Sequence, residues 1–131
     1  MTTFRGGCLC GRVEFEVDAE LNEIIECNCV ICTKKGFLHL FVPRERFRFL
    51  QPFAPVVSVT FHADYAEHFY CRSCGIHAHH QPRSLPGFID VNVRCLNDVD
   101  LRKLTIIQVE GHEWDHSVDI PPPSPSPTAT A

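Results

Sequence analysis

Hydrophobic and polar residues alternate along several short stretches of this chain, which is the pattern of half-buried β-strands. In residues 12–17, Val13, Phe15 and Val17 fall on one face, and Arg12, Glu14 and Glu16 fall on the other. The other predicted strands are residues 37–42, 44–49, 56–62, 65–70 and 88–93, with residues 76–80 also extended. The pattern therefore predicts a mostly β domain.

Helical periodicity is scarce. Residues 33–36 suggest one short helical turn that Gly36 ends, and residues 101–109 suggest a loop with one short strand. We expect a single domain over residues 1–120, with Trp114 covering part of its core. Residues 121–131 are rich in Pro, Ser and Thr, a composition typical of a disordered tail.

Charge narrows the classes of function. The chain has 131 residues and a formal net charge of −4, so it lacks the basic footprint of proteins that bind nucleic acid or anionic membranes. The arginine row at Arg44, Arg46 and Arg48 is therefore interpreted as a solvated strand face. No apolar run approaches the ~20 residues of a membrane span, and the first residues lack a secretory apolar region. We expect a cytoplasmic protein.

Eight cysteines dominate the candidate chemistry. In a reducing compartment they are expected to be metal ligands or reactive thiols, not a disulfide framework. They form a Cys-x-Cys pair, a Cys-x-Cys-x-x-Cys triplet, a Cys-x-x-Cys pair and a single Cys95. The motif positions are Cys8 and Cys10; Cys27, Cys29 and Cys32; and Cys71 and Cys74.

The simplest partition joins the two pairs into one four-thiolate zinc site and leaves the triplet as a second zinc site with three ligands. A closed structural zinc site has four ligands, whereas a reactive site keeps a position open. Other partitions remain: the triplet shares ligands with a pair, or Cys95 supplies the fourth ligand of the second site. Two closed sites without chemistry are a further alternative.

Other polar residues give weaker signals. Of the eight histidines, His77, His79 and His80 are interpreted as partly exposed strand residues. His77 is the candidate for a hydrogen bond to a zinc ligand. Lys34, Lys35 and Arg72 are basic groups near cysteines that would attract an anionic ligand.

The three cysteine motifs, in this order, resemble those of the glutathione-dependent formaldehyde-activating enzyme family, which also includes the centromere protein V type. The resemblance rests on Gly7–Val13, on Cys27–Gly36 and on Tyr70–His77, and it spans about residues 4–116. It implies an Mss4-like fold of β-sheets around zinc. It also implies a structural zinc on Cys8, Cys10, Cys71 and Cys74, and an activity-linked zinc on Cys27, Cys29 and Cys32.

The resemblance further implies a carbon–sulfur lyase that forms S-hydroxymethylglutathione from formaldehyde and glutathione. On this hypothesis the cofactors are two zinc ions, the partners are a small thiol and an aldehyde, and Lys34, Lys35 and Arg72 hold the glutathione carboxylates. A non-catalytic zinc module that binds a thiol or a protein is the alternative hypothesis. A redox protein using Cys-x-x-Cys ranks below both.

Overall fold

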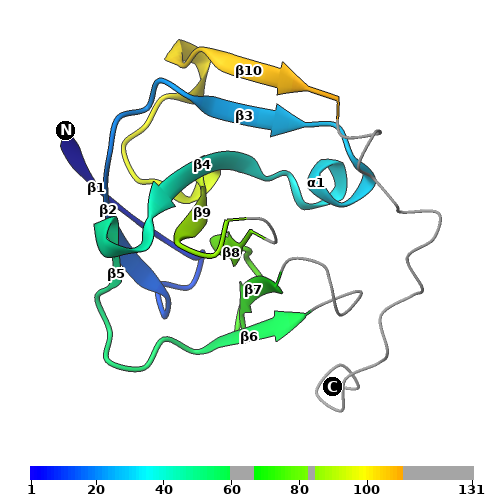
Figure 1. The fold of residues 1–131 in the computed structure, drawn as a ribbon. Helices are drawn as coiled ribbons and strands as arrows, with labels where there is room; N and C mark the ends of the chain where they lie inside the picture. The colour runs from blue at the N-terminus through cyan, green and yellow to red at the C-terminus, as the bar shows by residue number, and fades with distance from the viewer. Residues whose placement is uncertain (60–66, 83–84, 111–131) are drawn as a thin grey trace.

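The computed structural model describes residues 1–59, 67–82 and 85–110, and in this part of the chain the protein is mostly β-sheet. A small sheet has the strand order β1-β2-β5, and a large one has the order β10-β3-β4-β9-β8-β7-β6 (Figure 1). All strand pairs are antiparallel except β10 with β3. The strands are β1 Thr2–Gly7, β2 Glu14–Ala19, β3 Ile24–Cys27, β4 Leu38–Pro43, β5 Phe47–Phe49, β6 Val56–Val59, β7 Glu67–Cys71, β8 His79–Gln81, β9 Phe88–Asn92 and β10 Ile106–Val109.

Helices are short. The α-helix α1 spans Val30–Lys35, and three 3₁₀ turns, η1 to η3, span Arg44–Arg46, Val93–Cys95 and Leu101–Lys103. The predicted helical turn is confirmed, but the helix begins earlier, because Cys29 caps it by accepting a hydrogen bond from the Cys32 amide. Gly36 ends it in the left-handed conformation, at φ 64°, which glycine adopts without steric cost. Within the described residues, no helix is long and apolar enough to cross a membrane.

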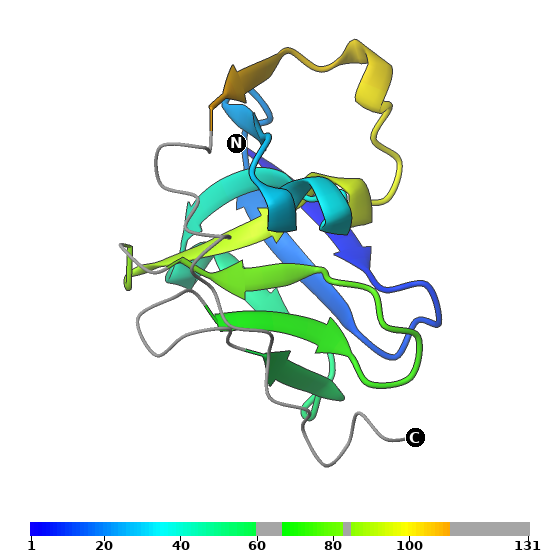
Figure 2. The same cartoon turned by 90° about the vertical axis from the view of Figure 1, so that its right-hand side faces the viewer.

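The core lies between the two sheets, and Figure 2 shows the blue β1–β2 hairpin beside the green strands of the larger sheet. Phe15 and Val17 of β2 are fully buried, as the alternation predicts. They belong to one apolar cluster with Leu40 of β4 and Val91 of β9, which pair across the large sheet. Burial of this face holds the register of the sheet, because a slip by one residue would expose it.

Two sequence predictions are wrong. Residues 44–49 are not one strand, since η1 follows Pro43 and only Phe47–Phe49 is extended. At the start of η1, the Arg44 amide donates to the Gly87 carbonyl, and the Arg44 guanidinium donates to the Pro86 carbonyl. The second error concerns the histidines, because His79 and His80 are buried rather than partly exposed.

Several predictions lie outside the described residues: the end of the strand at 56–62, the start of the strand at 65–70, Trp114 and the tail at 121–131.

Candidate metal centres

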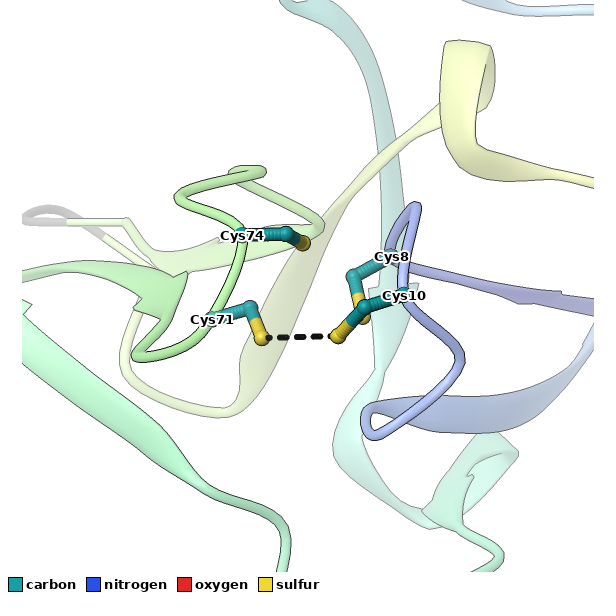
Figure 3. Close-up of side chains that lie close together, drawn as sticks. All are labelled: Cys8, Cys10, Cys71 and Cys74. Atoms are coloured by element: carbon teal, nitrogen blue, oxygen red, sulfur yellow. Dashed lines mark hydrogen bonds between the residues drawn. The ribbon is translucent and has the colours of Figure 1, made fainter.

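The loop between β1 and β2 and the turn after β7 bring four cysteines together, although more than sixty residues separate the two segments in the sequence. Cys8 and Cys10 come from the loop, and Cys71 and Cys74 from the turn (Figure 3). Their sulfurs lie within 4.8 Å of one another. This is the first of two cysteine clusters, called here the four-cysteine cluster.

The sulfur separations of this cluster suit a tetrahedral metal ion. Cys8 Sγ lies 3.5 Å from Cys10 Sγ, and Cys10 Sγ lies 3.7 Å from Cys71 Sγ. With Zn–S bonds of about 2.3 Å, the sulfurs of a tetrahedral zinc site lie about 3.8 Å apart. The four residues therefore fit zinc in both ligand type and spacing.

Backbone hydrogen bonds shape both halves of the four-cysteine cluster. In the loop, the Cys8 amide bonds to the Val13 carbonyl, and the Val13 amide donates to Cys8 Sγ at 3.3 Å. In the turn, the Cys71 amide bonds to the Ile76 carbonyl, and the Ser73 amide donates to Cys71 Sγ at 3.4 Å. A backbone hydrogen bond at Arg12 lowers the pKa of Cys10 to about 6, whereas burial raises the pKa of Cys71 to about 11.

The second cluster, called here the triplet, consists of Cys27, Cys29 and Cys32, whose sulfurs also lie within 4.8 Å of one another. Cys27 ends β3, Cys29 caps α1, and Cys32 lies in the first turn of α1. The Cys29 amide donates to Cys27 Sγ at 3.5 Å, and the Cys32 amide donates to Cys29 Sγ at 3.4 Å. The strand-to-helix connection thus turns three thiols toward one point.

The electrostatics of the triplet favour a cation. A hydrogen bond with Cys29 and burial raise the pKa of Cys32, and burial raises the pKa of Cys27. Three thiolates this close repel one another, and a divalent cation removes that cost because metal ligands bind in the thiolate form. The triplet therefore fits zinc, with one protein ligand fewer than the four-cysteine cluster.

A row of polar side chains crosses the large sheet next to the triplet. The strand register places His39, Asp90, His80 and His68 on one face of four adjacent strands, β4, β9, β8 and β7. Neither His39 nor Asp90 is among the site residues predicted from the sequence. The sequence pattern gave no signal for them, because Asp90 and Asn92 alternate with apolar residues as they would on a solvated strand face.

Asp90 connects this row to the triplet. Asp90 is 0% exposed, its Oδ2 is hydrogen-bonded to His39 Nδ1 at 2.5 Å, and the same oxygen lies 3.2 Å from His80 Nε2. Its Oδ1 accepts a hydrogen bond from the Leu40 amide at 3.2 Å. Burial raises the pKa of Asp90 and lowers the pKa of His80 to about 2. On its other side, His39 Nε2 lies 3.2 Å from Cys32 Sγ.

The basic residues proposed from sequence fall in different places. Lys34 is exposed on α1, whereas the Lys35 ammonium is half-buried and donates to His68 Nδ1 at 2.8 Å. Burial lowers the pKa of Lys35 to about 8, an effect that Cys32 and Asp90 oppose, so its ammonium is still charged at neutral pH. Arg72 is exposed in the turn of the four-cysteine cluster.

Cys95 and His77 lie away from the triplet cluster. The Cys95 thiol donates to the His77 carbonyl at 3.7 Å, and its pKa, raised to about 11 by burial, also responds to Cys8 and Cys74. It is therefore beside the four-cysteine cluster, and the structure does not bring it to the triplet. The His77 ring packs on Tyr70, and among the described residues its Nδ1 has no hydrogen-bond partner.

Comparisons with known proteins identify a family and a similar solved structure. The sequence model of the family described as “Glutathione-dependent formaldehyde-activating enzyme” matches residues 3–114. Among solved structures, a protein of Rhodobacter sphaeroides shares 32% sequence identity with a TM-score of 0.71. The match covers 79% of this chain and 97% of that one.

Proposed function

Because this chain belongs to the glutathione-dependent formaldehyde-activating enzyme family, we propose that it is a zinc-dependent carbon–sulfur lyase acting on an adduct of glutathione and an aldehyde. At the family level the function is glutathione-dependent activation of formaldehyde, with these two small molecules as partners. The observation that carries the finer proposal is the triplet, three converging thiols beside a half-buried lysine.

The two clusters have different roles in this proposal. Zinc on Cys8, Cys10, Cys71 and Cys74 is structural, since it joins the β1–β2 loop to the turn after β7. Zinc on Cys27, Cys29 and Cys32 serves the reaction. A bound zinc ion there supplies a positive charge that lowers the pKa of a coordinated thiol, so that the nucleophilic thiolate is present at neutral pH.

The chain's own residues bind and orient the substrate. Cys29 and Cys32 are held by their amide hydrogen bonds and by the helix they begin, so the triplet is preorganised. Lys35 adds a fixed positive charge next to the triplet, which attracts an anionic thiol such as glutathione. Lys34 on the same helix is the second candidate for binding the glutathione carboxylates, and Arg72 is the third.

The experiment measures exchange between free glutathione and its formaldehyde adduct by NMR. We expect the two-zinc protein to bind glutathione and to accelerate the exchange, and the Cys29→Ala protein to do neither. Thiols add to formaldehyde readily without a catalyst, so the rate is compared with protein-free buffer at the same pH. The proposal is rejected if the two-zinc protein neither binds glutathione nor changes the rate.

A non-catalytic zinc module is the second candidate, and one observation favours it. His39 Nε2 lies 3.2 Å from Cys32 Sγ, so a buried protein side chain already occupies space beside one thiol of the triplet. Such a module would bind glutathione weakly or not at all.

A further inference from the structure

Each sulfur of the triplet lies beside a nitrogen atom of the protein. The Cys29 amide donates to Cys27 Sγ at 3.5 Å, and the Cys32 amide donates to Cys29 Sγ at 3.4 Å. For Cys32 Sγ, the neighbouring nitrogen belongs to a side chain, since His39 Nε2 lies at 3.2 Å. The third sulfur therefore has a ring nitrogen where the first two have backbone amides.

The direction of the Cys32 contact follows from the chemistry of a metal ligand. Cysteine binds a metal as the thiolate, which has no proton to donate. A hydrogen bond to a metal-bound Cys32 must therefore run from His39 Nε2–H to the sulfur. The three sulfurs lie within 4.8 Å of one another, and His39 is outside that group. Contact with a single sulfur fits a hydrogen bond, whereas a ligand of the same ion would lie close to all three.

Asp90 holds the His39 ring in this position. Asp90 Oδ2 is hydrogen-bonded to His39 Nδ1 at 2.5 Å, and Asp90 Oδ1 accepts a hydrogen bond from the Leu40 amide. The ring also packs on Phe37, with 4.9 Å between the ring centroids. These contacts fix the plane of the ring, so Nε2 stays beside Cys32.

The buried His39–Asp90 pair is suited to supply the proton on Nε2. When Nε2–H donates to the sulfur, a second proton lies between Nδ1 and Oδ2, and the pair as a whole is neutral. A pair with a single proton would carry a negative charge, which is costly for a carboxylate that is 0% exposed. Burial therefore favours the state in which Nε2 is a donor.

Such a hydrogen bond changes how readily Cys32 reacts. A thiolate that accepts a hydrogen bond is stabilised as an anion and is a weaker nucleophile. An aldehyde at the triplet can meet either the substrate thiolate or a cysteine ligand. Attack by Cys32 would form a carbon–sulfur bond to the protein, and the resulting alkoxide would take a proton from water. A donor at Cys32 disfavours this side reaction.

We propose that His39, positioned by Asp90, donates Nε2–H to the metal-bound thiolate of Cys32 and thereby directs the aldehyde to the substrate thiol. His39 acts through Cys32, so it is a positioning residue and not a metal ligand. The inference rests on the proposed function in one respect, that a metal ion and an aldehyde meet at the triplet.

The first measurement is NMR of the zinc-loaded protein with ¹⁵N-labelled histidine. We expect the His39 Nε2 resonance to be that of a protonated ring nitrogen, with an N–H proton that exchanges slowly because the ring is buried. His39→Gln assigns the resonance by removing it. A His39 Nε2 that carries no proton in the zinc-loaded protein overturns the inference.

The second measurement is the rate at which iodoacetamide alkylates each cysteine of the zinc-loaded protein, followed by mass spectrometry of its peptides. We expect His39→Leu to raise the rate at Cys32 about 10-fold, the factor that corresponds to a hydrogen bond to a charged group, and to leave Cys27 unchanged. His39→Gln should restore slow alkylation, because its side-chain amide also offers an N–H donor.

His79→Phe is the matched control, because His79 is also buried but lies on the opposite face of the sheet. It should leave the rate at Cys32 unchanged. An unchanged Cys32 rate in His39→Leu, or an equal rise at every cysteine of the triplet, overturns the inference. If His39→Leu does not fold, the proton on Nε2 in the unmodified protein decides.

Glutathione separates this inference from the proposed function. A protonated Nε2 and a protected Cys32, in a protein that neither binds glutathione nor changes the exchange rate, would overturn the function and support the hydrogen bond. Glutathione binding and faster exchange with no proton on His39 Nε2 would overturn the inference and support the function.

Discussion

At the scale of single residues, burial decides the state of the histidines. His79 lies on the core face of the large sheet, where its ring stacks on Phe69 at 4.7 Å and contacts Phe47 and Phe49. Burial, with smaller contributions from the charges of Lys35 and Arg44, lowers the pKa of His79 to about 4. The folded protein therefore keeps this imidazole neutral where an unfolded chain protonates it.

This makes the free energy of unfolding depend on pH. Between an unfolded pKa near 6.5 and the folded value near 4, the unfolded chain binds one more proton, so stability is lost as pH falls through that window. His79→Phe should remove this term and reduce the loss of stability between pH 7 and pH 5 by about 2 kcal/mol. Urea unfolding at both pH values measures it.

Phe49→Leu, in the same aromatic group, is the control for packing. It should change stability equally at both pH values. An unchanged pH difference in His79→Phe would mean that His79 does not titrate as its burial implies.

At the scale of elements, the β1–β2 hairpin and its loop position half of the four-cysteine cluster. The backbone is so close at Gly7 that a Cβ there would lie 2.2 Å from the Val13 carbonyl oxygen. The same carbonyl accepts the hydrogen bond from the Cys8 amide. A side chain at Gly7 would therefore displace the segment that carries Cys8.

Gly7→Ala should lower the free energy of unfolding by about 1–3 kcal/mol, the usual cost of forcing extra atoms into a packed site. It should also speed metal release from the four-cysteine cluster, followed with a chromophoric chelator. Gly87→Ala is the matched control, because a Cβ there meets nothing within 4 Å, and its effect should stay within about 0.5 kcal/mol. Equal effects of the two substitutions would contradict the steric account.

Sequence patterns predicted some strands correctly and others wrongly, and the difference has a physical cause. The alternation at Val13, Phe15 and Val17 predicted a strand correctly because one face of β2 is buried. The alternation after Pro43 predicted a strand wrongly. Residues 44–46 form η1 because Arg44 bonds to Pro86 and Gly87, more than forty residues away. The polar row of His39 and Asp90 depends on the register of β4 with β9, which spacing along the chain does not show.

At the scale of the whole molecule, the two cysteine clusters differ in the distance along the chain between the segments that they join. The four-cysteine cluster joins two segments that are distant in sequence, so a metal ion bound there would stabilise the native state alone, whereas the triplet is local, within six residues. The pairing of the two short motifs was expected from the sequence, because together they supply four thiolates. The placement of Cys95 beside this cluster was not expected from the sequence, because a single cysteine has no spacing to a partner that would indicate its position.

The central claim, that only the four-cysteine cluster is structural, is tested most directly by counting zinc and measuring unfolding in Cys29→Ala and Cys74→Ala. We predict that Cys29→Ala binds one zinc per chain instead of two and unfolds cooperatively. Cys74→Ala should lose its cooperative transition, because a structural zinc contributes about 10 kcal/mol, comparable to the entire stability of an ordinary domain, about 5–15 kcal/mol. The same zinc content and the same unfolding curve in both variants would contradict the account.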